Sequence, residues 1–261
     1  MCSAIAVNAP IGVMDSGVGG LSVLKHLTSQ LPHEHFIYFA DSAHAPYGNK
    51  TATEIQQRCE IVANTLIDQG AKALVVACNT ATAAAIGSMR QHYALPIIGM
   101  EPAVKPAAAA SKNGIIGVLA TTGTLQSAQF AALLEHYGQN VQVVTQACVG
   151  LVECIEQGQL DAPQTQALLK QYCQPLMAAG ADTIVLGCTH YPFVRQYIQE
   201  IVGPNVTLID TGAAVAKRLQ QVLEQRQMLN AATEAGDYVF LTSGTEETQR
   251  VMQQLWSQTA Y

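Results

Sequence analysis

The stretch Ala73-Leu-Val-Val-Ala-Cys78-Asn79-Thr80 is an apolar run that ends at a cysteine followed by short polar side chains. The same pattern returns in Asp182-Thr-Ile-Val-Leu-Gly-Cys188-Thr189, where the cysteine lies 110 positions later (188 − 78). A second pair of runs, Gly12-Val-Met-Asp15-Ser16 and Gly117-Val-Leu-Ala-Thr121, is separated by 105 positions (117 − 12). Two pairs with nearly equal offsets indicate that the chain contains two similar halves.

Short runs rich in valine and isoleucine alternate with stretches of helical periodicity along the chain, which is typical of βα units around a mostly parallel sheet. We therefore predict an α/β fold of two similar domains, each a mostly parallel sheet flanked by helices, related by a pseudo-two-fold duplication. The first domain is expected to comprise residues 1–100 with a returning tail, 211–261, and the second residues 101–210. The expected strands are Ile11–Met14, Phe36–Phe39, Leu74–Ala77, Ile97–Met100, Ile115–Leu119, Val141–Val144, Thr183–Leu186, Val206–Ile209 and Tyr238–Leu241.

Two helix starts carry local signals. Thr51 and Glu54 have the spacing of a capping box, and the apolar periodicity that follows runs to Gly70, a typical C-terminal stop. A second helix is expected to begin at Pro192, because proline suits the first helical position.

The composition excludes several classes of protein. Only 12% of the 261 residues are charged and the formal net charge is −6, which argues against disorder and against nucleic acid as the primary ligand. No apolar run approaches the roughly 18 residues of a membrane-spanning helix, so a membrane role is not expected. Because no Lys or Arg precedes Lys25, the N-terminus lacks the basic region of a secretory signal, and we expect a cytoplasmic protein.

The seven cysteines are scattered without a C-x-x-C pair, which indicates neither a disulfide framework nor a structural zinc site. Most are expected to be free thiols that pack as small apolar side chains. Cys78 and Cys188 differ from the rest because each follows a predicted strand and precedes a helix. Ligands of such folds bind at the carboxyl ends of the strands, and a helix N-terminus lowers a thiol pKa from about 8.5.

Two thiols on equivalent loops suit one reaction in particular. Inversion of a carbon next to a carboxylate removes a proton from one face and returns a proton to the other, and two bases on opposite sides do this without turning the substrate over. A thiol and a thiolate exchange these roles at each turnover. The simpler alternative is that both cysteines only pack or cap helices, and that the protein binds an amino acid as a sensor without catalysis.

Other chemistries fit the residues less well. A hydrolase with one cysteine nucleophile activated by His190 gives Cys78 no role in the reaction. Cys188 and His190 are too close in sequence for a zinc finger, and no second ligand pair is present. The glycine run at 17–20 completes neither a dinucleotide-binding nor a P-loop motif. Lys50 as a pyridoxal-binding lysine is less favoured than Lys50 as a solvated surface residue.

Four motifs together resemble the glutamate racemase family. They are Asp15-Ser16-Gly17-Val18-Gly19-Gly20, Asp41 with Pro46-Tyr47-Gly48, Cys78-Asn79-Thr80-Ala81-Thr82 and Gly187-Cys188-Thr189-His190-Tyr191-Pro192. The resemblance implies cofactor-independent interconversion of L- and D-glutamate, which supplies D-glutamate for bacterial peptidoglycan, on two similar α/β domains that face each other. It also implies that Cys78 and Cys188 alternate as acid and base, without a metal, in an enzyme that is commonly a homodimer.

The resemblance also assigns the remaining site residues. Asp15 is expected beside Cys78, and His190 with Glu153 beside Cys188, each assisting proton transfer by its thiol. Glu153 lies in Gly150-Leu-Val-Glu153-Cys154, where an ordinary helix-surface glutamate would look the same. The expected substrate-binding residues are Asp15, Ser16, Pro46, Tyr47, Gly48, Asn79, Thr80, Thr121, Thr189 and His190. A racemase of another amino acid such as aspartate, or of a hydantoin, remains an alternative.

Overall fold

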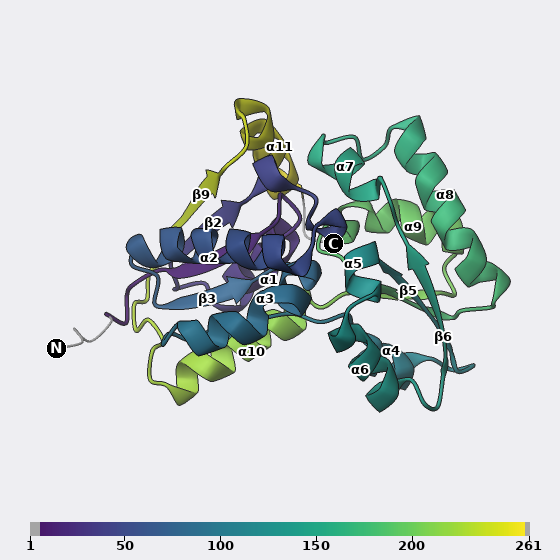
Figure 1. Cartoon of the computed structure of the whole chain (residues 1–261), viewed down its shortest axis with the longest axis horizontal. Coiled ribbons are helices and arrows are strands. Elements are labelled where there is room, and N and C mark those ends of the chain that lie inside the picture. Colours follow the sequence, from purple (N-terminus) through teal and green to yellow (C-terminus); the bar gives the residue numbers. More distant parts are fainter. Residues whose placement is uncertain (1–5, 259–261) are drawn as a thin grey trace.

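The chain forms two parallel sheets that lie side by side, each flanked by helices (Figure 1). The computed structural model describes residues 6–258. The strands are β1 (Ile11–Asp15), β2 (Phe36–Ala40), β3 (Ala73–Val76), β4 (Ile97–Ile98), β5 (Ile115–Ala120), β6 (Gln142–Ala147), β7 (Thr183–Leu186), β8 (Thr207–Ile209) and β9 (Tyr238–Thr242). The α-helices are α1 (Leu21–Gln30), α2 (Ala52–Asp68), α3 (Asn79–His92), α4 (Val104–Ala110), α5 (Thr122–Leu125), α6 (Ala128–Tyr137), α7 (Leu151–Glu156), α8 (Pro163–Ala178), α9 (Arg195–Val202), α10 (Gly212–Gln225) and α11 (Glu246–Ser257). Short 3₁₀ turns are η1 (Ser42–His44), η2 (Tyr47–Asn49) and η3 (Tyr191–Val194).

The two sheets repeat one strand order. The five-stranded sheet runs β4-β3-β1-β2-β9 and the four-stranded sheet β6-β5-β7-β8. Taken from its other edge, the second sheet runs β8-β7-β5-β6, so β5 corresponds to β1 and β7 to β3. All strand pairs are parallel. The predicted α/β fold of two similar halves is confirmed.

The corresponding strands also end in the same way. The Ala77 N–H donates to the Met14 carbonyl at 2.7 Å, and the Gly187 N–H donates to the Leu119 carbonyl at 2.7 Å. In each half, therefore, the loop that carries the cysteine leaves the sheet beside the loop that follows the central strand. The fold puts the two halves of the site on the carboxyl ends of their sheets, where backbone groups are free to bind a ligand.

The local predictions hold with one correction. Every predicted strand is present, with ends that differ by at most three residues, and Thr51 and Glu54 form the capping box at the start of α2. Gly70 follows this helix with φ of 85°, a conformation that glycine adopts without strain. The helix expected from Pro192 begins instead as the 3₁₀ turn η3, and α9 starts at Arg195. Proline fixes its own φ but not the i→i+4 bonds that follow, so a 3₁₀ turn satisfies it equally well.

The C-terminal part of the chain lies on the first half (Figure 1). Helix α10 packs on α1, and β9 extends the first sheet by pairing with β2. The division of the chain into domains at residues 100 and 210 stays a prediction.

A buried ion pair fastens this returning segment. The Lys72 ammonium lies 2.6 Å from a Glu34 carboxylate oxygen, and both side chains are almost fully buried. Lys72 also donates to the carbonyls of Val7 and Met228, while the Asn230 N–H donates to Glu34 at 2.8 Å. The pair is thus surrounded by hydrogen bonds from segments before β1 and after α10, which offset the cost of burying two charges.

We predict that Lys72→Met destabilises the protein by about 3–5 kcal/mol, because it leaves the Glu34 carboxylate buried without a partner. Urea unfolding followed by circular dichroism measures the change, with the exposed Lys112→Met as the matched control. The double variant Lys72→Met/Glu34→Leu should recover much of the loss. If Lys72→Met were as stable as Lys112→Met, the role given to the ion pair of Lys72 and Glu34 would be contradicted.

Candidate active site

The loops at the carboxyl ends of the two sheets enclose a small cavity of about 10 Å³, room for about one water molecule. Both Cys78 and Cys188 line it, together with Ser16, Pro46, Tyr47, Gly48, Asn79, Thr80, Thr121, Val152, Gly187, Thr189 and His190. Of the predicted site residues, only Asp15 and Glu153 do not line the cavity. A substrate larger than water enters only if the surrounding loops separate.

The first thiol lies at the N-terminus of α3. Cys78 Sγ accepts from the Ala81 N–H at 3.4 Å and donates to Ser16 Oγ at 3.7 Å. Burial raises the pKa of Cys78 well above its usual value, and the nearby Asp15 carboxyl raises it further. At neutral pH this side chain is therefore a protonated thiol that can give up a proton.

Asp15 lies just behind this thiol, as predicted. Its carboxyl group accepts from the backbone N–H groups of Ser16 at 2.7 Å and Gly20 at 2.5 Å. The Thr189 hydroxyl, from the other half, also donates to it at 3.2 Å. Burial raises the pKa of Asp15, which brings this carboxyl closer to the range in which it exchanges protons with a neighbouring thiol.

The second thiol is paired with a histidine. Cys188 Sγ lies 3.6 Å from His190 Nδ1, and His190 Nε2 lies 2.5 Å from Glu156 Oε1. Burial opposes protonation of His190, but hydrogen bonds with Cys188 and Glu156 outweigh it and raise the pKa of the imidazole well above its usual value. His190 therefore keeps a proton that it can share with the Cys188 sulfur.

The carboxylate beside His190 is Glu156, which corrects the expectation for Glu153. Within residues 6–258 no hydrogen bond joins Glu153 to His190, and Glu153 instead lies close enough to Tyr172 to act on it electrostatically. Both glutamates belong to α7, and residues three apart lie on neighbouring positions of one helix face. Glu156 is one turn further along and reaches the other half, which the segment Gly150–Cys154 that carries the resemblance does not show.

Glu156 also joins the two halves of the molecule. It accepts from the Val18 N–H at 2.7 Å and from the Ser42 hydroxyl at 2.9 Å, both of which belong to the first half. The loop that meets it contains Gly17 and Gly19, and a Cβ on these residues would collide with Glu156 and His190 respectively. The glycine run at 17–20, which completes no nucleotide-binding motif, therefore allows this loop to approach Glu156 and His190 closely.

One polar side chain in the cavity wall has no partner. Asn79 is 4% exposed, yet neither its amide nitrogen nor its amide oxygen has a hydrogen-bond partner among the described residues. Leaving such groups buried and unpaired costs about 1–3 kcal/mol each. An amide with both a donor and an acceptor free points to a polar ligand in this cavity.

The wall formed by Tyr47 is held from behind. The Tyr47 hydroxyl donates to Asp41 at 2.7 Å, and Arg58 binds both oxygens of the same carboxylate at 2.9 Å. Ser243, which follows β9, donates to Asp41 at 2.8 Å. Although burial acts in the opposite direction, the hydrogen bonds from Arg58 and Tyr47 lower the pKa of Asp41, so it stays ionised.

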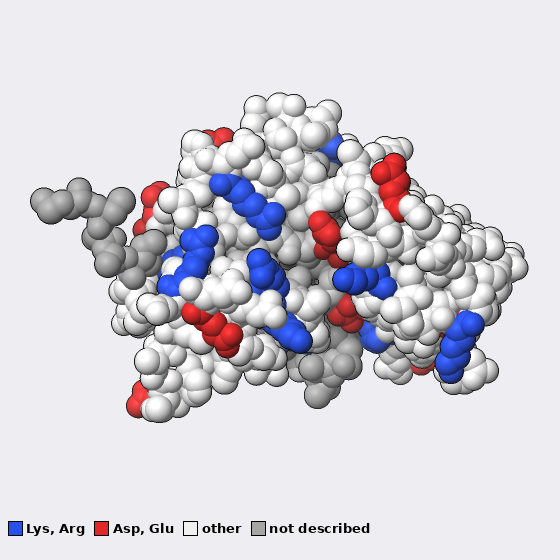
Figure 2. Space-filling view, turned by 90° about the horizontal axis from the view of Figure 1, so that it is seen from below, with Lys and Arg blue, Asp and Glu red and all other residues white. Residues whose placement is uncertain are grey.

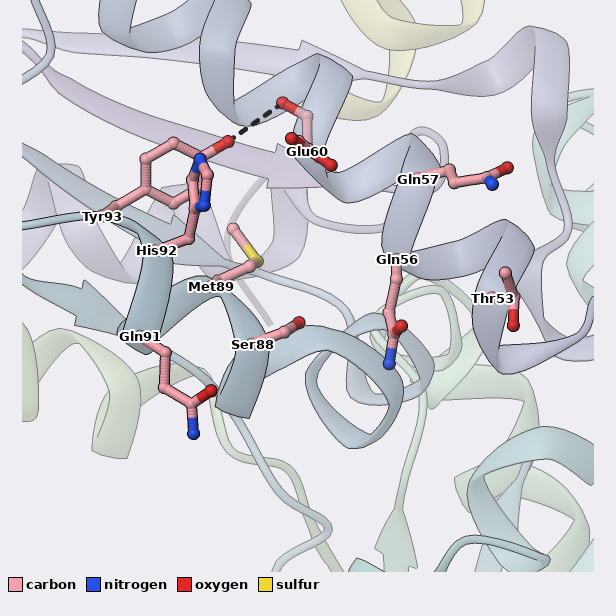
Figure 3. Close-up of a pocket in the computed structure, with 9 residues that line it drawn as sticks. All are labelled: Thr53, Gln56, Gln57, Glu60, Ser88, Met89, Gln91, His92 and Tyr93. Carbon is pink, nitrogen blue, oxygen red and sulfur yellow. Dashed lines mark hydrogen bonds between the residues drawn. The ribbon is translucent and has the colours of Figure 1, made fainter.

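Larger hollows lie elsewhere but lack this chemistry. A groove of about 380 Å³ between α2 and α3 is lined by polar side chains such as Gln56, Glu60 and Tyr93, and no cysteine is among the described residues that line it (Figure 3). In the face seen in Figure 2, acidic and basic side chains are interspersed among uncharged surface. Within residues 6–258 there is no cluster of His, Cys, Asp and Glu that could hold a metal, and no helix long and apolar enough to cross a membrane.

Comparison with known proteins identifies the family to which the chain belongs. The model of the Asp/Glu/Hydantoin racemase family matches residues 11–219. The glutamate racemase of Ectopseudomonas mendocina is 59% identical over 222 residues, which are 85% of this chain and 84% of that protein. The glutamate racemase of Stutzerimonas stutzeri is 52% identical over 253 residues, which are 97% and 96% of the two chains. The crystal structure of Francisella tularensis glutamate racemase in complex with D-glutamate superimposes with a TM-score of 0.83 at 32% identity, covering 97% of this chain and 95% of that one.

We predict that Glu156→Gln lowers the pKa of His190, because it removes the negative charge that stabilises the imidazolium. Since the folded pKa lies above the unfolded value of about 6.5, this charge stabilises the protein below that pH, and the contribution is lost as the pH rises through the folded pKa. Titration of the imidazole by ¹⁵N NMR measures the shift. Glu153→Gln is the matched control and should leave the His190 titration unchanged, and an equal effect of the two changes would refute the assignment.

Proposed function

The chain belongs to the Asp/Glu/Hydantoin racemase family, and we propose that within it this protein is a glutamate racemase whose two thiols interconvert L- and D-glutamate. The observation that carries the proposal is one buried cavity lined by both Cys78 and Cys188, each with its own proton-exchanging neighbour. The relatives described above are named glutamate racemases, and the Francisella tularensis protein binds D-glutamate.

The proposed reaction moves one proton on each side of the substrate. In one direction the sulfur of Cys188 takes the α-proton while the Cys78 thiol gives its proton to the opposite face of the same carbon. The configuration of the α-carbon is thereby inverted. The two sulfurs exchange protonation states, and the reverse reaction restores them. Asp15 behind Cys78 and His190 behind Cys188 return each thiol to its starting state.

The cavity wall suits an amino acid with two carboxylates. Among the described residues no Lys or Arg lines it, so the substrate is held by the Asn79 amide, by the hydroxyls of Ser16, Thr80, Thr121 and Thr189, and by the backbone at Gly48. The chemistry is assigned to groups of the chain itself, which is why we propose that no cofactor takes part. We further propose that the enzyme works in the cytoplasm as a homodimer and supplies D-glutamate for peptidoglycan; sedimentation velocity tests the dimer.

We expect the purified protein, without added pyridoxal phosphate or metal, to incorporate solvent deuterium at the α-carbon of L-glutamate and to form D-glutamate. Mass spectrometry and chiral chromatography measure the two outcomes. Deuterium exchange at the α-carbon of L-aspartate but not of glutamate would show that aspartate is the substrate. Binding of glutamate without any deuterium exchange would favour the alternative that the protein is an amino-acid sensor without catalytic activity.

Single replacement of either thiol, Cys78→Ser or Cys188→Ser, should reduce racemisation by at least about 10²-fold, because one face of the α-carbon then lacks an efficient acid or base. Each variant keeps one thiol, so slow α-deuterium exchange without inversion should persist for one enantiomer, and for the opposite enantiomer in the other variant. Cys173→Ser, a buried thiol outside the cavity, is the control. Retained racemisation in both variants excludes the two-base mechanism.

A further inference from the structure

Three threonine hydroxyls form a closed ring where the two halves meet. Thr80 Oγ1 lies 2.8 Å from Thr121 Oγ1 and 3.2 Å from Thr124 Oγ1, and Thr121 donates to Thr124 at 3.0 Å. Thr80 belongs to α3 of the first half, whereas Thr121 is the N-cap of α5 and Thr124 lies in its first turn, both in the second half. Each hydroxyl has one hydrogen and can accept two, so the ring uses every hydrogen and leaves acceptor capacity free.

The members of the ring are not equivalent. Thr80 and Thr121 line the cavity between the thiols, whereas Thr124 is 1% exposed and lies outside the cavity lining. Within residues 6–258 the Thr124 hydroxyl bonds only to the other two hydroxyls of the ring. Its own backbone N–H donates to Thr121 Oγ1 at 3.2 Å, which fixes the Thr121 side chain as the cap of α5.

The ring is also separate from the proton-transfer groups. None of its hydroxyls bonds to Asp15, Ser16, Thr189 or His190 in the described part of the chain. Asn79 and Thr189 directly follow the two cysteines that act on the α-carbon, so the α-carboxylate bonded to that carbon is assigned to them. A carboxylate further along the substrate requires other donors, and the described residues of the wall include no arginine.

We propose that Thr124 is a positioning residue that turns the Thr80 and Thr121 hydroxyls toward the side-chain carboxylate of glutamate, an inference that rests on the proposed function. When that carboxylate arrives, Thr80 and Thr121 turn their hydrogens from the ring to its oxygens. Thr124 then donates to one of these two hydroxyls, which polarises that hydroxyl as a donor. No covalent step is involved, and Thr124 does not touch the substrate.

The test compares Thr124→Val, which keeps the shape and removes the hydroxyl, with Thr124→Ser, which keeps the hydroxyl. Thr124→Val should raise the KM for both enantiomers of glutamate about tenfold, the equivalent of weakened hydrogen bonds to a charged group, and change kcat by less than about twofold. Thr124→Ser should stay within about twofold of the wild-type KM. The matched control is Thr165→Val, because the hydroxyl of Thr165 in α8 is equally buried but donates to the Gln159 carbonyl, away from the cavity.

The result that overturns the proposal is a KM for Thr124→Val equal to that of Thr165→Val, or a KM that Thr124→Ser does not restore. If Thr124→Val fails to fold, Thr121→Val takes its place beside Thr124→Ser, and an unchanged KM in Thr121→Val overturns the proposal equally. Absence of glutamate racemisation by the wild-type protein refutes the proposed function itself, so the two failures are distinguishable.

Discussion

The carboxylate of Glu156 is the contact on which the shape of the site depends. It binds His190 of its own half and the Val18 backbone and Ser42 hydroxyl of the other half, so one group both orients the acid–base partner of Cys188 and holds the halves together. The cavity between the thiols has a volume of only about 10 Å³ because this contact and the approach of the glycine loop draw the halves close. Entry of substrate must therefore lengthen these same bonds.

This arrangement follows from the repeated topology. Parallel strands place their carboxyl ends on one edge of a sheet, and the repeated strand order gives each half a central strand with the cysteine-bearing strand beside it. Two such edges facing each other bring Cys78 and Cys188 to one cavity although they are far apart in the chain. The duplication thus supplies what a two-sided proton transfer requires, a similar loop on each side of the substrate.

The sequence predicts the strands and the cavity wall well, because both depend on local patterns. Apolar runs with polar ends mark the strands, and the residues just after them line the cavity. Contacts between the halves are not local, and this is where the prediction of Glu153 differs from the observed Glu156. The sequence does not reveal Thr124 for a related reason, since its hydroxyl acts through Thr80, which belongs to the other half. A proline signal at 192 likewise does not distinguish a 3₁₀ turn from an α-helix.

The absence of lysine and arginine from the cavity wall formed by the described residues and the burial of the thiols act together. Burial raises the pKa of Cys78, so its thiolate, once formed, is a stronger base toward the weakly acidic α-proton than an exposed thiolate would be. An arginine beside it would bind a carboxylate more strongly but would also stabilise the thiolate and weaken it as a base. Hydroxyls and amides bind the carboxylates without that effect. A protein with little charge therefore suits a doubly acidic substrate, provided that its donors are held in place by neighbours such as Thr124.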